Sequence, residues 1–163
     1  MMRETPTLRR GKLLNGLMFL AVACVANVAA RSEPIKPSQI FVVSGDTIEV
    51  FNRRPAVALL GFKAPERRPA RAQCAAERAL GSRATQRVRE LVSGGGLDYQ
   101  ARRCACESGT EGTSRCNLGR TCGILTVNGR DLGQILIDEK LAVPFVCGDT
   151  NCPSPPNPWC AAQ

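Results

Sequence analysis

The stretch from Ile40 to Phe62 constrains the fold more than any other part of the chain, because three apolar segments alternate there with turns. The first turn contains Gly45 and Asp46, residue types that tolerate unusual backbone angles, and the second turn contains Pro55. The last segment is apolar at nearly every position, which indicates a central strand. The pattern predicts three strands in a tight meander. The segments are Ile40–Val43, Thr47–Phe51 and Ala56–Phe62.

A helix is expected after the meander, at roughly Ala70–Val92. Apolar residues recur there at helical spacing and predict a face that packs on the core. The glycines that begin at Gly94 are expected to end this helix. The residues of the predicted core face are Leu80, Ala84, Val88 and Leu91.

Two further strands, Leu97–Cys106 and Thr121–Val127, and a short helix from Leu132 to about Lys140 complete the expected elements. Asp131 stands where it can cap the short helix. The order β-β-β-α-β-β-α predicts a mainly β, α+β fold, namely a five-stranded OB-type barrel stabilised by disulfides. Such barrels often bind oligonucleotides on one face.

The N-terminal 30 residues have the pattern of a secretory signal peptide. Basic residues precede an apolar run, Leu13–Ala30, that ends in small residues. We expect cleavage after Ala30, export to the periplasm or the medium, and no membrane association of the mature chain. An uncleaved anchor and a lipoprotein signal at Leu20–Cys24 are the alternatives. The expected divisions are a signal peptide (1–30), a leader (31–39), a domain (40–146) and a tail rich in Cys and Pro (147–163).

Cysteines indicate how the exported part is stabilised. Of the 9 cysteines, Cys24 lies in the expected signal peptide, and an even number remains. An even count in a small exported chain predicts a disulfide framework, whose pairing the sequence leaves open. Structural zinc is the alternative, although the chain has no His and no CxxC pair. The candidates are Cys74, Cys104, Cys106, Cys116, Cys122, Cys147, Cys152 and Cys160.

The charge of the chain is positive. It has 22 Lys and Arg against 14 Asp and Glu, and loss of the first 30 residues removes four basic residues and one acidic residue, which leaves a net charge of +5. Such a basic surface can attract polyanions such as nucleic acid, or it can be an ordinary solvated surface. The absence of His removes the usual general base at neutral pH, so any catalysis must use carboxylates, Arg, Lys or a metal.

Several motifs resemble the staphylococcal-nuclease-like, or thermonuclease, family. VVSGDTIEV and ALLGFKAPE resemble that family's first strands and turns, CAAERALGSRA resembles the helix that follows, and LGR resembles its Tyr-Gly-Arg. GRDLGQILIDEKLA resembles its late helix. The resemblance covers roughly Gln39–Val143, and the tail rich in cysteine resembles exported proteobacterial members of the family.

The resemblance implies a phosphodiester-cleaving site that uses calcium. Asp46 would be a calcium-binding carboxylate, and the carbonyl group of Ala64 would be a backbone ligand. Glu66 would activate the attacking water, and Arg120 would clamp the phosphate. The implied partner is DNA or RNA.

Two positions depart from the family pattern. Lys63 stands at the position of the second calcium carboxylate, and Ala58 stands at the position of the first arginine. Two unit charges 4 Å apart interact by about 4 kcal/mol at an effective dielectric constant near 20, so an ammonium group there should repel a cation. Lys63 is expected to pair with Asp46 and Glu66 as a built-in cation, or else to grip the phosphate itself.

We therefore expect hydrolysis to be weak or lost in a nuclease-like domain. The alternatives are a non-catalytic module that binds nucleic acid and a structural, disulfide-rich envelope protein that binds another protein. The sequence leaves the oligomeric state open.

Overall fold

The computed structural model describes residues 32–51 and 53–160 of the 163-residue chain. The expected signal peptide and its cleavage site lie outside the described residues. None of the helices in residues 32–51 and 53–160 combines the length and the apolar character needed to span a bilayer.

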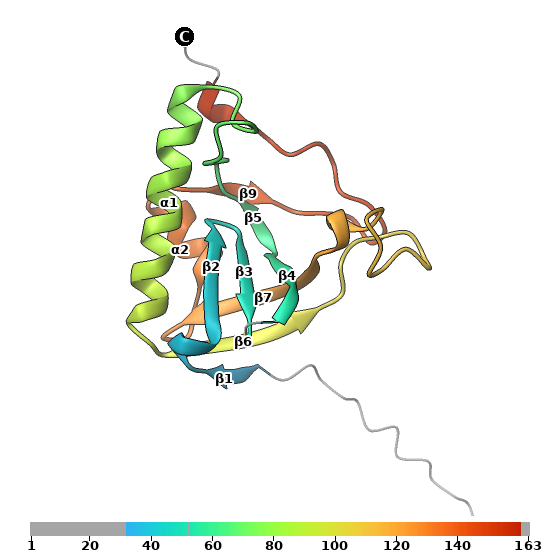
Figure 1. Cartoon of the computed structure of the whole chain (residues 1–163), viewed down its shortest axis with the longest axis horizontal. Coiled ribbons are helices and arrows are strands. Elements are labelled where there is room, and N and C mark those ends of the chain that lie inside the picture. Colours follow the sequence, from blue (N-terminus) through green and yellow to red (C-terminus); the bar gives the residue numbers. More distant parts are fainter. Residues whose placement is uncertain (1–31, 52, 161–163) are drawn as a thin grey trace, which may run out of the picture.

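The described residues form a mixed α+β fold, with a sheet that curls into a half-barrel and two α-helices (Figure 1). The sheet order is β1-β6-β7-β4-β3-β2, with β8 added beside β7. All pairings are antiparallel except that of β4 with β7, which is parallel. The strands of this sheet are β1 (Glu33–Ile35), β2 (Ile40–Ser44), β3 (Thr47–Val50), β4 (Arg53–Leu59), β6 (Leu97–Arg102), β7 (Thr121–Val127) and β8 (Arg130–Asp131).

A second, two-stranded sheet joins β5 (Gly61–Lys63) to β9 (Val143–Phe145). The expected strand Ala56–Phe62 is therefore wrong as one element, because the chain breaks at Gly61, whose φ of +92° suits glycine. The sequence reasoning also missed β9 and β1. β1 lies inside the expected leader and pairs with β6, so part of the leader belongs to the sheet.

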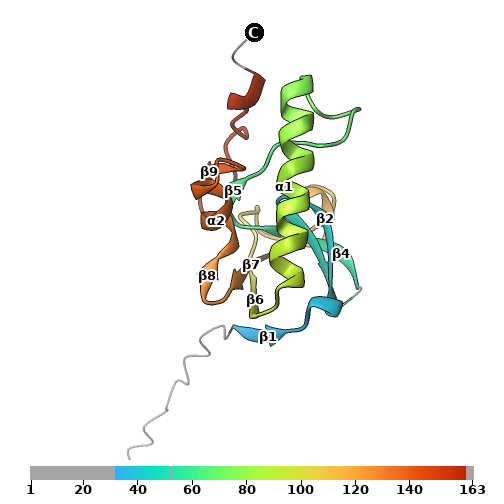
Figure 2. The same ribbon diagram turned by 90° about the vertical axis from the view of Figure 1, so that its left-hand side faces the viewer.

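The long helix α1 (Ala75–Ser93) covers β2, as the two views in Figures 1 and 2 show. It begins later than expected because Cys74 is its N-cap and accepts a hydrogen bond from the Glu77 backbone N–H. Ala84 and Val88 are fully buried, which confirms the predicted core face. The short helix α2 (Leu132–Asp138) is capped by Asp131, as expected.

Four disulfides in the described part of the chain confirm the predicted framework. Cys74–Cys160 joins the start of α1 to the end of the tail, where a 3-10 turn, η3 (Pro158–Cys160), packs on α1. Two disulfides, Cys104–Cys122 and Cys106–Cys116, hold the loop between β6 and β7. The fourth, Cys147–Cys152, closes a short loop in the tail.

Helix α1 approaches the backbone after β5 at Gly81. A methyl group at position 81 would lie 2.6 Å from the carbonyl oxygen of Pro65 and 2.8 Å from the backbone N of Arg67. These neighbours are backbone atoms and cannot rotate away. Glycine at position 81 therefore sets how closely α1 packs on the segment that contains Glu66.

We predict that Gly81→Ala lowers the free energy of unfolding by about 1–3 kcal/mol, because overpacking forces backbone shifts. Chemical denaturation measures this change. Gly94→Ala is the matched control, since a methyl group there would meet nothing closer than 3.5 Å at an ordinary φ of −69°. Equal midpoints for Gly81→Ala and the natural chain would contradict the close approach.

Candidate functional site

The residues singled out by the family resemblance gather at one end of the sheet. Asp46 lies in the turn between β2 and β3, and Arg120 directly precedes β7. Thr47 in β3 pairs with Ala58 in β4, and Ala58 pairs with Cys122 in β7. The register of three strands thus brings the turn and the start of β7 together.

Lys63, the last residue of β5, makes an ion pair with Asp46. Its Nζ lies 2.6 Å from Asp46 Oδ2. The Asp46 side chain is only 11% exposed, and its other oxygen accepts hydrogen bonds from the hydroxyls of Ser44 (3.0 Å) and Thr47 (3.1 Å). Each oxygen of this carboxylate therefore has a donor, and the ammonium group neutralises its charge.

Arg120 is held against the same turn. Its Nη1 donates to the Thr47 hydroxyl at 3.2 Å, while Nε and Nη2 donate to the backbone and side-chain oxygens of Asn117 at 3.1 and 2.7 Å. Asn117 has a φ of +50°, which bends the chain so that Arg120 folds back on it. Arg120 keeps N–H groups for a further acceptor, because a guanidinium has five.

Glu66 is occupied by Arg68. The backbone N–H and Nε of Arg68 donate to Glu66 Oε1 at 2.9 and 3.0 Å, and Nη2 donates to Oε2 at 2.8 Å. Partial burial alone would raise the pKa of Glu66, but these hydrogen bonds and the charges of Arg68 and Lys63 outweigh it and lower the pKa to about 2. A carboxylate with such a pKa is a weak general base.

A second glutamate supports the segment that contains Glu66. Glu77 of α1 is buried and accepts hydrogen bonds from the backbone N–H groups of Glu66 (3.2 Å) and Gln73 (2.7 Å). The side-chain amide of Asn157 in the tail donates to the same carboxylate at 3.1 Å. Glu77 thus connects helix α1, the tail and the backbone of the site.

Calcium does not fit the observed donor set. A calcium ion takes six to eight oxygen ligands, usually with carboxylates among them. Both carboxylates of the site, Asp46 and Glu66, already accept hydrogen bonds at both oxygens, and the ammonium of Lys63 adds positive charge beside Asp46. Ala64, the expected backbone ligand, is 1% exposed and packs its Cβ against Gly45.

The structure brings Asp46, Lys63 and Arg120 together but pairs Glu66 differently from expectation. Lys63 was expected to neutralise both carboxylates; it hydrogen-bonds only to Asp46, and Arg68 holds Glu66. The sequence reasoning missed Arg68 and Asn117. The arginine two positions after Glu66 was a usable signal, because side chains two residues apart lie on the same side of an extended segment.

The chain matches no protein-family model and no curated protein.

What the site can do chemically follows from its charges and its donors. Lys63 and Arg68 are paired with carboxylates, whereas Arg67 and Arg120 make no ion pair within the described residues. Arg67 donates instead to the backbone oxygen of Val43. The site is therefore net positive and rich in donors, which suits an anion.

We predict that Arg68→Gln raises the pKa of Glu66 toward 4.5, its ordinary value. A carboxylate with a lowered pKa stabilises the fold above pH 4.5, and that stabilisation is lost as the pH falls from there through about 2. Because Arg68 is half exposed, we expect a loss of about 1 kcal/mol at pH 7 that shrinks toward pH 2. Carboxyl NMR titration measures the pKa, and denaturation at several pH values measures the stability.

Arg87→Gln is the matched control. Arg87, on the surface of α1, donates from Nε and Nη2 to the Glu139 carboxylate, much as Arg68 donates to Glu66. This variant should leave the titration of Glu66 unchanged. An ordinary pKa for Glu66 in the natural chain would contradict the observed clamp.

Proposed function

We propose that the chain is an exported domain of the staphylococcal-nuclease-like type whose former phosphodiesterase site now binds the phosphates of single-stranded nucleic acid without metal-dependent cleavage. The observation that carries this proposal is the 2.6 Å ion pair between Lys63 and Asp46. The ammonium neutralises the carboxylate that the family would use for calcium.

The architecture supports this assignment. The antiparallel strands β2, β3 and β4 are followed by the short strand β5 and by α1, then by the antiparallel pair β6 and β7, and then by the short strand β8 and α2. The parallel contact of β4 with β7 curls the sheet in the manner of an OB-type barrel. The disulfides support export, because such bonds persist in oxidising compartments.

Phosphate binding is supported by Arg67 and Arg120. Both guanidinium groups are partly buried and are held by oxygens of the protein without an ion pair in the described segments. Arginine presents several N–H donors in a plane that matches phosphate oxygens. A phosphate at this end of the sheet would therefore find donors already positioned.

Loss of hydrolysis is supported by three features. Ala58, in β4 opposite Thr47, lacks the guanidinium that the family resemblance implies. Glu66 is clamped by Arg68 and has a pKa of about 2. Among the described residues of the site, both oxygens of Asp46 and of Glu66 already accept hydrogen bonds, which leaves calcium no free carboxylate oxygen there.

The test uses the oxidised chain from residue 31 to residue 163 with labelled single-stranded DNA and RNA. We expect binding that is equal with calcium and with chelator, and no cleavage over the same period. If two phosphates contact the protein, the logarithm of the affinity falls with the logarithm of salt with a slope of about −1.4. Gel analysis of the same samples detects cleavage.

Arg120→Ala is expected to weaken binding about tenfold, because a hydrogen bond between charged groups contributes about 1.5 kcal/mol or more. Arg130→Ala is the matched control, since Arg130 lies beyond the other end of β7 and pairs with Asp138. Equal losses of affinity in the two variants would mean that nucleic acid does not bind at Arg120. Cleavage that survives chelation would mean that Lys63 replaces the metal in a working nuclease.

Restoring the family residues is expected to restore calcium-dependent cleavage. The changes are Ala58→Arg with Lys63→Asp, with and without Arg68→Gln, because Arg68 holds Glu66 in the natural chain. We expect the triple variant to cleave faster than the double variant. A triple variant that folds, binds calcium and stays inert would contradict descent from a nuclease site.

A further inference from the structure

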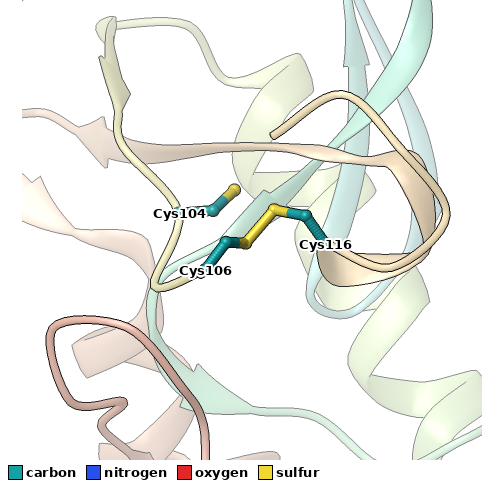
Figure 3. Close-up of side chains that lie close together, drawn as sticks. All are labelled: Cys104, Cys106 and Cys116. Carbon is teal, nitrogen blue, oxygen red and sulfur yellow. A yellow bond between two sulfur atoms is a disulfide. The ribbon is translucent and has the colours of Figure 1, made fainter. Parts of the chain in front are cut away.

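Three sulfur atoms gather in the loop between β6 and β7, and a fourth, in β7, is bonded to one of them. The Sγ atoms of Cys104, Cys106 and Cys116 all lie within 4.8 Å of one another, and Cys122 is bonded to Cys104. Figure 3 shows the Cys104 side chain pointing toward the Cys106–Cys116 disulfide. Cys116 and Cys122 are only 2% and 3% exposed, so the rest of the protein shields these two cysteines from solvent. Two disulfides therefore share one site.

We propose that these four cysteines form a redox-controlled zinc site, with two disulfides in the oxidised chain and one tetrahedrally bound Zn²⁺ in the reduced chain. The inference does not depend on the proposed binding of nucleic acid.

The dimensions of the cluster suit a tetrahedral metal. With Zn–S bonds of about 2.3 Å, neighbouring sulfurs in a tetrahedral site lie about 3.8 Å apart. Reduction lets the bonded sulfurs separate from about 2 Å to that distance. The Sγ atoms of Cys104, Cys106 and Cys116 already lie within 4.8 Å of one another, and Cys122 Sγ, bonded to Cys104, is one disulfide bond away from this group. Rotation of the side chains after reduction, with the largest movement at Cys122, would therefore bring four thiolates around one ion.

The surroundings of the sulfurs suit thiolates. The side-chain amide of Asn117 donates to Cys122 Sγ at 3.3 Å and lies 3.8 Å from Cys104 Sγ. Groups that donate hydrogen bonds to metal ligands orient them and commonly contribute ten- to a hundredfold in metal affinity. Asn117, Leu118 and Gly119 all have positive φ, which turns the chain sharply directly after Cys116. The same turn thus provides a ligand and a hydrogen-bond donor.

The local charge also suits a zinc tetrathiolate, which carries two negative charges. Between residues 102 and 122 the chain has four arginines and two glutamates, a net charge of +2. The spacing Cys-x-Cys counted against zinc in the sequence. In the fold, however, three of the ligands come from the loop after β6 and the fourth comes from β7, so the site does not depend on a CxxC pair.

The chemistry balances as follows. Two equivalents of a dithiol supply four electrons and four protons, become two disulfides and leave four thiols in the protein. Two equivalents of a phosphine supply the four electrons instead, while two waters supply the four protons and the oxygens of the two phosphine oxides. Binding of one Zn²⁺ then displaces four protons. In the reverse direction, two equivalents of hydrogen peroxide each accept two electrons and, with two protons from solvent, give two waters. The two disulfides form again and Zn²⁺ is released.

The site bears on Arg120, because that residue lies between Cys116 and Cys122 in the sequence. Both the disulfide-bonded state and the zinc-bound state fix Cys116 and Cys122, the two ends of the segment that contains Arg120. Reduction without metal would free both cysteines. Zinc would therefore keep the segment ordered when the disulfides are open.

The test uses the full chain after residue 30, reduced with a phosphine and freed of reductant without oxygen. Cobalt(II) is the spectroscopic probe, because tetrahedral thiolate sites give it intense absorption. We expect one equivalent of Co²⁺ to bind and one equivalent of Zn²⁺ to displace it. Hydrogen peroxide should then release the zinc, which a chromogenic indicator counts.

Cys106→Ser with Cys116→Ser should abolish binding of one equivalent, whereas Cys147→Ser with Cys152→Ser should retain it. Asn117→Ala keeps every cysteine and should lower the affinity ten- to a hundredfold, so the proposal is tested even if a serine variant does not fold. No binding by the natural reduced chain would overturn the proposal. Equal affinity in the Cys106/Cys116 variant would also overturn it.

Discussion

The ion pair between Lys63 and Asp46 determines what this end of the sheet can do. It places an ammonium group 2.6 Å from a carboxylate that is nearly buried, at the turn where β2 becomes β3. A buried carboxylate without a partner would be strongly destabilising, so a cation is required there. The chain provides that cation from its own β5, and the hydroxyls of Ser44 and Thr47 satisfy the remaining oxygen.

The geometry around this pair depends on close backbone packing. Gly45 lets the turn approach Ala64, and Gly81 lets α1 approach the segment from Pro65 to Arg67. Glu77 then fixes the backbone of Glu66 from the helix side and connects it to the tail. The Cys74–Cys160 disulfide holds that tail in place. The site is thus positioned by rigid contacts from elements far apart in the sequence.

Sequence reasoning succeeded where the signal was local. The strands on both sides of Gly45, the core face of α1 and the Asp131 cap all follow from side-chain pattern and turn chemistry. The break at Gly61, the β5–β9 pair and the disulfide pairing depend on contacts between distant segments, which a local pattern does not encode. Lys63 was placed correctly beside Asp46, but the partner of Glu66 was missed, although Arg68 stands only two positions after that glutamate.

The most direct test of the central claim is a calorimetric titration of calcium into the oxidised natural chain and into Lys63→Asp. If the ammonium occupies the place of a cation, the natural chain will show no binding heat at millimolar calcium. Lys63→Asp, which offers a second carboxylate, will bind one ion. Calcium binding by the natural chain, with an affinity equal to that of the variant, would contradict the account.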